Sequence, residues 1–493
     1  MSEEVAQVEL QDITKNVENT DDVNEQEKTE DVKTNGEVNT DCQSVVEGTV
    51  NPAFTEEQES SLQDDVPPPM TYVDFMPRLI EEGATNADAP LYTEFSTVLE
   101  QANQWIKGNP SFKVMKFESF VKKLSDKEVA DLDQVMYHES SFGVNKYLRG
   151  LRLWLAPRVD TEEPVQEIGY LTTLPEILDD YNSESSMSIF RSGRFRAQTP
   201  VPSYCGMQDM MDRLNKFLKK RPIPGSILNV ETVKIKYDEY APKSLDSEKM
   251  CWADCGKEDR VYIYAIRVYY VIGKPAFEVV GHHDEVPVCM NNWDLSSKIR
   301  FCPFTTVVQR AKNWLRAQKG IRVMNMQTVE IFSERTTKGE AKVYHDVAGH
   351  AEAHSHDIQF ARVLRIFFIQ GPKDETYPYK SLELTTRLFI PTRRGGWGKN
   401  CETFSKTMQR VITWLQLTKT PIFGIETVNH PFSPDSYGSG VRENDAVISL
   451  VASSGKYFIT TVRVYFPCEF KEPDPELLPK EEEEEGWWAC SVS

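Results

Sequence analysis

The stretch FSKTMQRVITWLQLTKTPIFGIETV, residues 404–428, combines two kinds of hydrophobic pattern. Its first half places apolar residues at Phe404, Met408, Val411 and Trp414, a spacing of three to four that predicts one buried face of a helix. Its last four residues, IETV, alternate between apolar and polar, as in a half-buried strand. The stretch therefore predicts a helix followed by a strand.

This pattern occurs four times along the 493 residues. Each copy has an anchor, an aromatic residue followed by Ile or Leu, and the anchors lie 97 to 112 residues apart: Trp105-Ile106, Phe217-Leu218, Trp314-Leu315 and Trp414-Leu415. Apolar residues recur ten, six and three positions before each anchor aromatic. We therefore expect four amphipathic helices, each with its anchor aromatic buried.

Two further segments follow each anchor at nearly constant distances. The first alternates like IETV, at 117–120, 230–233, 326–329 and 425–428. The second has an aliphatic face and an Arg-plus-aromatic face, at 151–155, 266–270, 364–368 and 462–466. Residues 277–288 and 381–391, upstream of the later helices, also have a strand pattern, so the unit reads β-α-β-β.

These matches predict an α+β protein of four tandem repeats of about 100 residues, each with one helix packed on an antiparallel sheet. The expected repeats span 71–160, 185–275, 276–372 and 378–470. Residues 1–70 hold 19 acidic and 3 basic residues, and residues 471–493 hold 8 and 2, so we expect two disordered acidic tails. The middle of the chain is nearly neutral, which disfavours nucleic-acid binding.

The recurring arginine is the first candidate functional feature. It comes two positions before an aromatic residue in all four copies, as Arg152, Arg267, Arg365 and Arg463. A guanidinium binds carboxylates and phosphates, so one interpretation is a ligand-binding surface. The other is a cross-strand ion pair with Glu118, Glu231 and Glu426, from which Gln327 in the third copy departs. A feature present in every copy favours the structural role.

Two further clusters are weaker candidates. His350, His354 and His356 are candidate metal ligands, although their spacing matches no standard site. The glycine-rich turn before the fourth helix carries Arg393, Arg394 and Lys399, cations that would suit an anion, but its spacing is not that of a P-loop. The sequence implies no cofactor, and it contains no recognised catalytic motif.

The last four residues, Cys490-Ser491-Val492-Ser493, fit the C-a-a-X prenylation pattern, and the final Ser favours farnesyl. The chain shows no signal peptide and no apolar segment long enough for a membrane helix. We therefore expect a cytoplasmic protein that is partly attached to the cytosolic face of membranes through Cys490.

The leading functional prediction is a non-enzymatic tandem-repeat scaffold with protein partners. One alternative is a carrier or sensor that holds a small ligand at the Arg-aromatic faces. The other is an enzyme whose site cannot be recognised from sequence.

Overall fold

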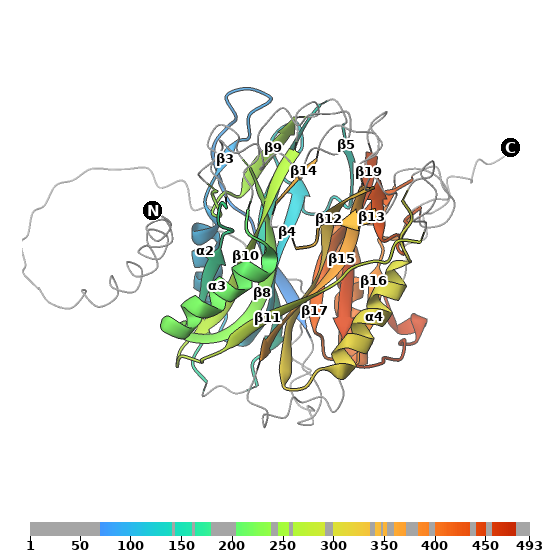
Figure 1. Ribbon diagram of the computed structural model, residues 1–493. Coiled ribbons are helices and arrows are strands. Elements are labelled where there is room, and N and C mark those ends of the chain that lie inside the picture. The colour runs from blue at the N-terminus through green and yellow to red at the C-terminus, as the bar shows by residue number, and fades with distance from the viewer. Residues whose placement is uncertain are drawn as a thin grey trace, which may run out of the picture. The chain divides into compact units, whose positions relative to one another are not determined.

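Four antiparallel sheets and four helices make up most of the described chain. The computed structural model describes residues 70–479 except 141–142, 160–162, 179–203, 238–244, 256–259, 291–298, 336–340, 347–348, 353–358, 371–382, 394–399, 434–439 and 450–455. The described part is a mixed α+β structure of four repeat-like units, arranged around an axis like the blades of a propeller. Figure 1 shows β4, β8, β12 and β17 in the middle and helices α2, α3 and α4 outside them.

Each unit contains an outer strand, a helix, an inner strand, a short connector strand and a long middle strand, in that order. Unit 1 comprises β1 (Thr71–Phe75), α2 (Phe95–Gly108), β4 (Phe112–Lys123), β5 (Met136–Glu139) and β6 (Val144–Pro157). Unit 2 comprises β7 (Ile168–Thr173), α3 (Met207–Lys220), β8 (Gly225–Lys236), β9 (Cys251–Cys255) and β10 (Arg260–Ile272). Unit 3 comprises β11 (Val279–Glu285), α4 (Phe304–Ala317), β12 (Ile321–Arg335), β14 (Gly349–Glu352) and β15 (Gln359–Gln370). Unit 4 comprises β16 (Thr385–Phe389), α5 (Phe404–Thr418), β17 (Gly424–Phe432), β18 (Val447–Ser449) and β19 (Lys456–Phe466).

A few short elements are additional to the five elements of each unit. A two-stranded hairpin, β2 (Leu79–Glu81) with β3 (Leu91–Tyr92), precedes α2, and β13 (Ala341–Val343) extends β12. A 3-10 turn, η2 (Pro475–Leu477), follows the last strand. Unit 2 begins upstream of residue 185, the boundary expected from the sequence, because β7 pairs with β10. Within the described residues, every helix is too short or too polar to cross a bilayer.

The connector strands link the units by strand exchange. In each sheet the middle strand pairs with its own inner and outer strands and also with the connector strand of the following unit. Thus β9 pairs with β6, β14 with β10 and β18 with β15. The ring closes because β5 of unit 1 pairs with β19 of unit 4. No unit therefore has a complete sheet without its neighbour.

The four helices begin at Phe95, Met207, Phe304 and Phe404, ten residues before each anchor aromatic. The prediction that the anchor aromatic is buried is wrong in three of the four copies. Ile106, Leu218, Leu315 and Leu415 are buried, but Trp105, Phe217 and Trp314 are only half-buried, and Trp414 alone among the anchor aromatics is fully buried. One residue is a rotation of about 100° on a helix, so the aromatic lies at the edge of the buried face and the aliphatic residue after it lies at the centre.

Candidate functional site

The four repeated arginines lie in the interior, opposite the residues that the sequence proposed as partners. In the strand register Arg152 faces Glu118, Arg267 faces Glu231, Arg365 faces Gln327 and Arg463 faces Glu426. All four residues are at most 2% exposed. Arg152 is 3.5 Å from Glu118, and Arg463 is 3.8 Å from Glu426. The structural interpretation of these two pairs is confirmed.

Two of the arginines also bind an aspartate of their outer strand. Arg152 donates to both oxygens of Asp74 at 2.6 and 2.7 Å, and Arg365 donates to both oxygens of Asp284 at 2.8 and 2.6 Å. Burial alone would raise the pKa of Asp284, but the charge and hydrogen bonds of Arg365, together with His282 and His345, lower it. These bidentate hydrogen bonds give each buried guanidinium group an ionic partner. Burying the same group without a partner would reduce the stability of the fold.

A second set of hydrogen bonds joins each inner strand to the next. The carboxylate or amide of each unit receives the backbone N–H of a Ser or Thr in the preceding unit: Glu231 from Ser119 at 3.0 Å, Gln327 from Thr232 at 2.8 Å and Glu426 from Thr328 at 2.6 Å. Thr427 of unit 4 donates in the same way to Glu118 of unit 1. The ring therefore closes through side chains as well as through strand exchange.

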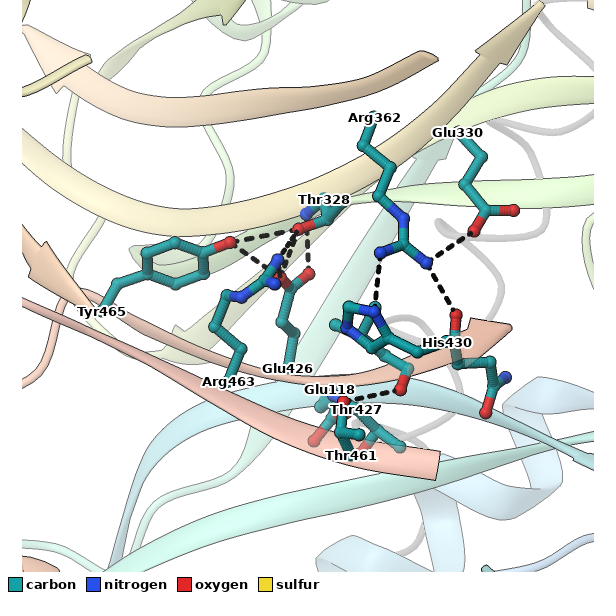
Figure 2. A network of polar contacts seen from close by, with 12 residues as sticks. Glu118, Thr328, Glu330, Arg362, Glu426, Thr427, His430, Thr461, Arg463 and Tyr465 are labelled. Carbon is teal, nitrogen blue, oxygen red and sulfur yellow. Dashed lines mark hydrogen bonds and ion pairs between the residues drawn. The ribbon is translucent and has the colours of Figure 1, made fainter. Parts of the chain in front are cut away.

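We call each contact between the inner strands of neighbouring units a joint. The arginines add a hydrogen bond at three of the four joints. Arg152 donates to the hydroxyl of Thr427 at 2.9 Å, Arg365 to that of Thr232 at 3.2 Å and Arg463 to that of Thr328 at 3.1 Å. Figure 2 shows Arg463, Thr328, Glu426 and Tyr465 converging in one such joint. The Ser or Thr that follows each Glu or Gln thus donates its backbone N–H to the neighbouring unit, and in three of the four copies its hydroxyl also accepts from an arginine.

The aromatic residue two positions after each arginine carries a hydrogen-bond donor only in the units whose inner strand has a Glu. Tyr269 donates to Glu231 at 2.7 Å, Tyr465 to Glu426 at 2.7 Å, and the indole of Trp154 to Glu118 at 3.2 Å. In unit 3 an amide replaces the carboxylate, and Phe367, which has no donor, replaces the Tyr or Trp. Gln327 instead donates its own N–H to the Thr232 carbonyl at 3.0 Å. In the third copy, Gln327 in place of Glu is therefore accompanied by Phe367 in place of Tyr or Trp, and each change compensates for the other.

A buried histidine lies next to the joint between units 3 and 4 (Figure 2). The Nδ1 atom of His430 is 2.7 Å from Arg362, and because a guanidinium only donates, Nδ1 accepts. Arg362 also donates to the Asn429 carbonyl at 3.0 Å. Burial, together with Arg362 and Arg463, lowers the pKa of His430 well below its usual value. His430 is therefore neutral in the folded protein at physiological pH.

A cavity of about 270 Å³ lies on the axis between the four inner strands. One end, here called its floor, contains Glu118, Glu231, Gln327 and Glu426, with Ser119, Thr328 and Thr427 beside three of them. The four repeated arginines are absent from its lining, and two of them, Arg152 and Arg463, are paired with the lining carboxylates Glu118 and Glu426. The ligand-binding role predicted for the arginines thus has no open surface beside their side chains in the described residues.

The other end of the cavity, here called its mouth, is lined by aromatic residues that the sequence analysis missed. Tyr147, Tyr262, Phe360 and Phe458 line it, each five positions before a repeated arginine. Two of them stack on aromatic residues from connector strands, Tyr147 on Trp252 with centroids 5.7 Å apart and Phe458 on Tyr137 at 5.4 Å. The signal was present in the sequence as an aromatic at constant distance from each arginine.

Charged groups accompany these rings. Glu139 accepts from the Tyr147 hydroxyl and Asp254 from the Tyr262 hydroxyl, and all four residues line the cavity. Burial, with Glu139 nearby, raises the pKa of Tyr147 well above its usual value. The indole N–H of Trp252, a lining residue that is 7% exposed, has no hydrogen-bond partner among the residues that the structure describes. A buried donor without a partner is uncommon in a folded protein.

The remaining candidates lie away from the cavity or outside the described residues. Arg393 forms a bridge with Cys401, and its guanidinium lies 5.3 Å from the Phe432 ring, while Arg394 and Lys399 lie outside the described residues. His350 belongs to β14, and His354 and His356 lie outside the described residues, as does Cys490. In the described ranges, His, Cys, Asp and Glu side chains form no group of three or more that could hold a metal ion.

Comparisons with known proteins return nothing for this chain: it matches no protein-family model, no curated protein and no solved structure.

Proposed function

We propose that this protein is a small-ligand carrier or sensor whose binding site is the axial cavity. The observation that carries the proposal is that all four units contribute to one cavity of about 270 Å³ with a polar floor and an aromatic mouth. Ligand sites in proteins combine apolar and aromatic walls with a few polar groups, and drug-sized ligands occupy about 300 to 1,000 Å³. The size of this cavity favours a smaller molecule.

The two ends of the cavity are built from different elements. Each floor carboxylate is fixed by hydrogen bonds across a joint between units, so the floor has a defined shape. The mouth includes residues of the connector strands β5 and β9. A ligand bound there would contact several units at once, and it would therefore stabilise the ring relative to the unfolded chain.

The test is a ligand-observed NMR screen of a fragment library that contains cationic, neutral and anionic compounds. Val121→Trp would fill the cavity, since Val121 lines it, and the matched control is Val129→Trp, at a position 61% exposed. Asn429→Trp provides a second filled cavity from β17 if the first variant folds poorly. We expect hits that Val129→Trp retains and both filled variants lose. Hits that persist in the filled variants, or a screen without hits, would refute the proposal.

We also propose that the four units are copies of one module, a β-α-β-β unit in which one helix packs on an antiparallel sheet. Its support is that buried residues of α2, including Phe95 and Ile106, share a hydrophobic cluster with Phe117 of β4 and Leu153 of β6. The corresponding residues of α4 and β15 share another, with Phe304 and Ile366 among them. An experimental structure tests this, because superposed units must agree in the placement of the helix.

Prenylation of Cys490, with partial attachment to cytosolic membrane faces, stays a prediction, as do the protein partners of a scaffold. Intact-mass analysis of protein from eukaryotic cells tests the lipid: loss of the last three residues with gain of a farnesyl group and a methyl ester is expected. An unmodified C-terminus would refute it. Glu481 to Glu485 work against attachment to an anionic leaflet, so we expect a divided cytosolic and membrane pool.

A further inference from the structure

We propose that the ligand of the axial cavity is a small aromatic amine that binds as the protonated cation. The inference rests on the proposed function, and it adds the chemical class of the ligand.

The first support is the balance of charge on the lining. Six carboxylates line the cavity, Glu118, Glu139, Glu231, Asp254, Glu330 and Glu426, against two lysines, Lys123 and Lys234. Arg152, Arg463 and Lys236 neutralise Glu118, Glu426 and Asp254, which leaves three carboxylates, Glu139, Glu231 and Glu330, against the two lysines. The cavity therefore favours a positive charge over a negative one.

The cations near the mouth are engaged with protein groups. Lys123 donates to the His138 carbonyl at 2.6 Å, and Lys236, behind the lining, is 3.1 Å from Asp254. The ammonium of Lys234 lies 3.7 Å from the centroid of the Tyr262 ring. This last contact shows that a ring at the mouth can hold an ammonium group in the geometry of a cation–π interaction.

The second support is the aromatic mouth. Six aromatic residues line this end of the cavity: Tyr137, Tyr147, Trp252, Tyr262, Phe360 and Phe458. Such rings pack against a flat apolar body and attract a cation through their faces. Carboxylates Glu139 and Asp254 lie among them, each bound to a tyrosine hydroxyl. Aromatic side chains and carboxylates together would bind a ligand that has an aromatic body and a protonated amine.

The test compares three indoles of similar size and different charge by isothermal titration calorimetry. Tryptamine carries a positive charge at pH 7, 3-propylindole is neutral and indole-3-propionate is negative. We expect tryptamine to bind at least about tenfold more tightly than the other two, a difference in the range of a desolvated cation–π and carboxylate site. Equal binding of the three, preference for the anion, or no binding of tryptamine at millimolar concentration would overturn the inference.

Two conservative substitutions identify the site. In Glu139→Gln combined with Asp254→Asn, each amide retains an oxygen that can accept the tyrosine proton, so the rings stay in place. We expect tryptamine to lose about tenfold in affinity and 3-propylindole to change less than twofold. Glu100→Gln, on the exposed face of α2, is the control and should leave both affinities unaltered. An equal loss for both compounds would instead indicate a distorted cavity and refute the charge argument.

The two proposals fail in different ways. If fragments of another charge class bind and the filled variant Val121→Trp abolishes that binding, the cavity is a ligand site and only the class is wrong. If binding of tryptamine survives in Val121→Trp, the cavity is not the site.

Discussion

Glu118 and Thr427 are 309 residues apart in the chain, yet the backbone N–H of Thr427 donates a hydrogen bond to the Glu118 carboxylate. This contact closes the ring, because it repeats between units 4 and 1 the bond that Ser119 makes to Glu231 between units 1 and 2. The first and last units are therefore neighbours in the same sense as units that follow one another in the chain. The ring makes three kinds of contact at its joints: strand exchange, a Glu or Gln bonded to a Ser or Thr, and an arginine.

Removing Glu118 should open this joint more than the others. In Glu118→Ala the N–H of Thr427 and the indole N–H of Trp154 lose their acceptor, and Arg152 keeps only Asp74 as an ionic partner. Breaking a buried ion pair from one side costs about 3 to 5 kcal/mol. Hydrogen exchange should show the amides of β5 and the paired part of β19 losing protection first.

Glu231→Ala is the matched variant at the joint between units 1 and 2. There β9 and the paired part of β6 should lose protection, while β5 keeps it. Uniform loss of protection across all four joints in either variant would show that the joints are not separable.

The exchange of Gln327 for Glu tests the compensated pair in unit 3. Gln327→Glu would place a carboxylate oxygen against the Thr232 carbonyl that now accepts its N–H, and Phe367 offers no hydroxyl. We expect a loss of about 1 to 3 kcal/mol in the free energy of unfolding at pH 7, measured by urea titration.

Phe367→Tyr in the same chain should recover part of that loss. Its hydroxyl would stand where Tyr269 and Tyr465 donate to their carboxylates in units 2 and 4. The double-mutant cycle isolates this interaction, because the Phe367→Tyr change alone buries a hydroxyl without a carboxylate partner. Strictly additive losses would contradict the pairing.

Two of the three tryptophan anchors, Trp414 and Trp314, should differ in their cost of truncation. Trp414 is fully buried among Phe389, Phe466 and Phe470, and its indole donates to Glu472 at 2.9 Å. Trp414→Ala should cost about 3 to 5 kcal/mol. Trp314 is half-buried and stacks on His283 with centroids 4.0 Å apart, so Trp314→Ala should cost about 1 to 3 kcal/mol. Equal costs in thermal or urea unfolding would contradict the assigned burial.

Stability should fall as the pH is lowered below about 6.5, in part through His430. The pKa of this residue is well below its ordinary 6.5 in the folded protein, so the unfolded chain binds a proton there that the folded chain does not. Stability from this group is therefore present above pH 6.5 and is lost below it, at up to about 1.4 kcal/mol per pH unit. His430→Gln should flatten the slope between pH 6.5 and 5 relative to the wild type. Parallel pH profiles would exclude this residue.

Much of the secondary structure could be predicted because it depends on local periodicity. The helix spacing and the alternating strands are visible in each copy, and comparison of the copies removes chance matches. The half-burial of Trp314 was missed because size suggested a buried ring, whereas the helix geometry placed Leu315 at the centre of the face. The connector strands were missed because they are short and pair with a different unit.

The site was predictable only in part. The register of Arg152 with Glu118 follows from strand alternation within one unit, and the sequence was sufficient for it. The contact of Arg152 with Thr427 depends on how units 1 and 4 meet, which no local pattern specifies. The aromatic mouth could have been found from the constant distance between Tyr147 and Arg152 in the four copies, but the cavity itself exists only once the ring is closed.

Because β5 of unit 1 pairs with β19 of unit 4, the first unit cannot complete its strand pairing until the fourth unit has been synthesised. The first unit leaves the ribosome with β5, which ends at Glu139, while its pairing strand β19 begins only at Lys456. At about 5 to 20 residues per second, β5 waits on the order of 15 to 60 s for its partner. During that interval the nascent chain presents an unpaired strand edge, the kind of surface that chaperones cover and that other chains can pair with.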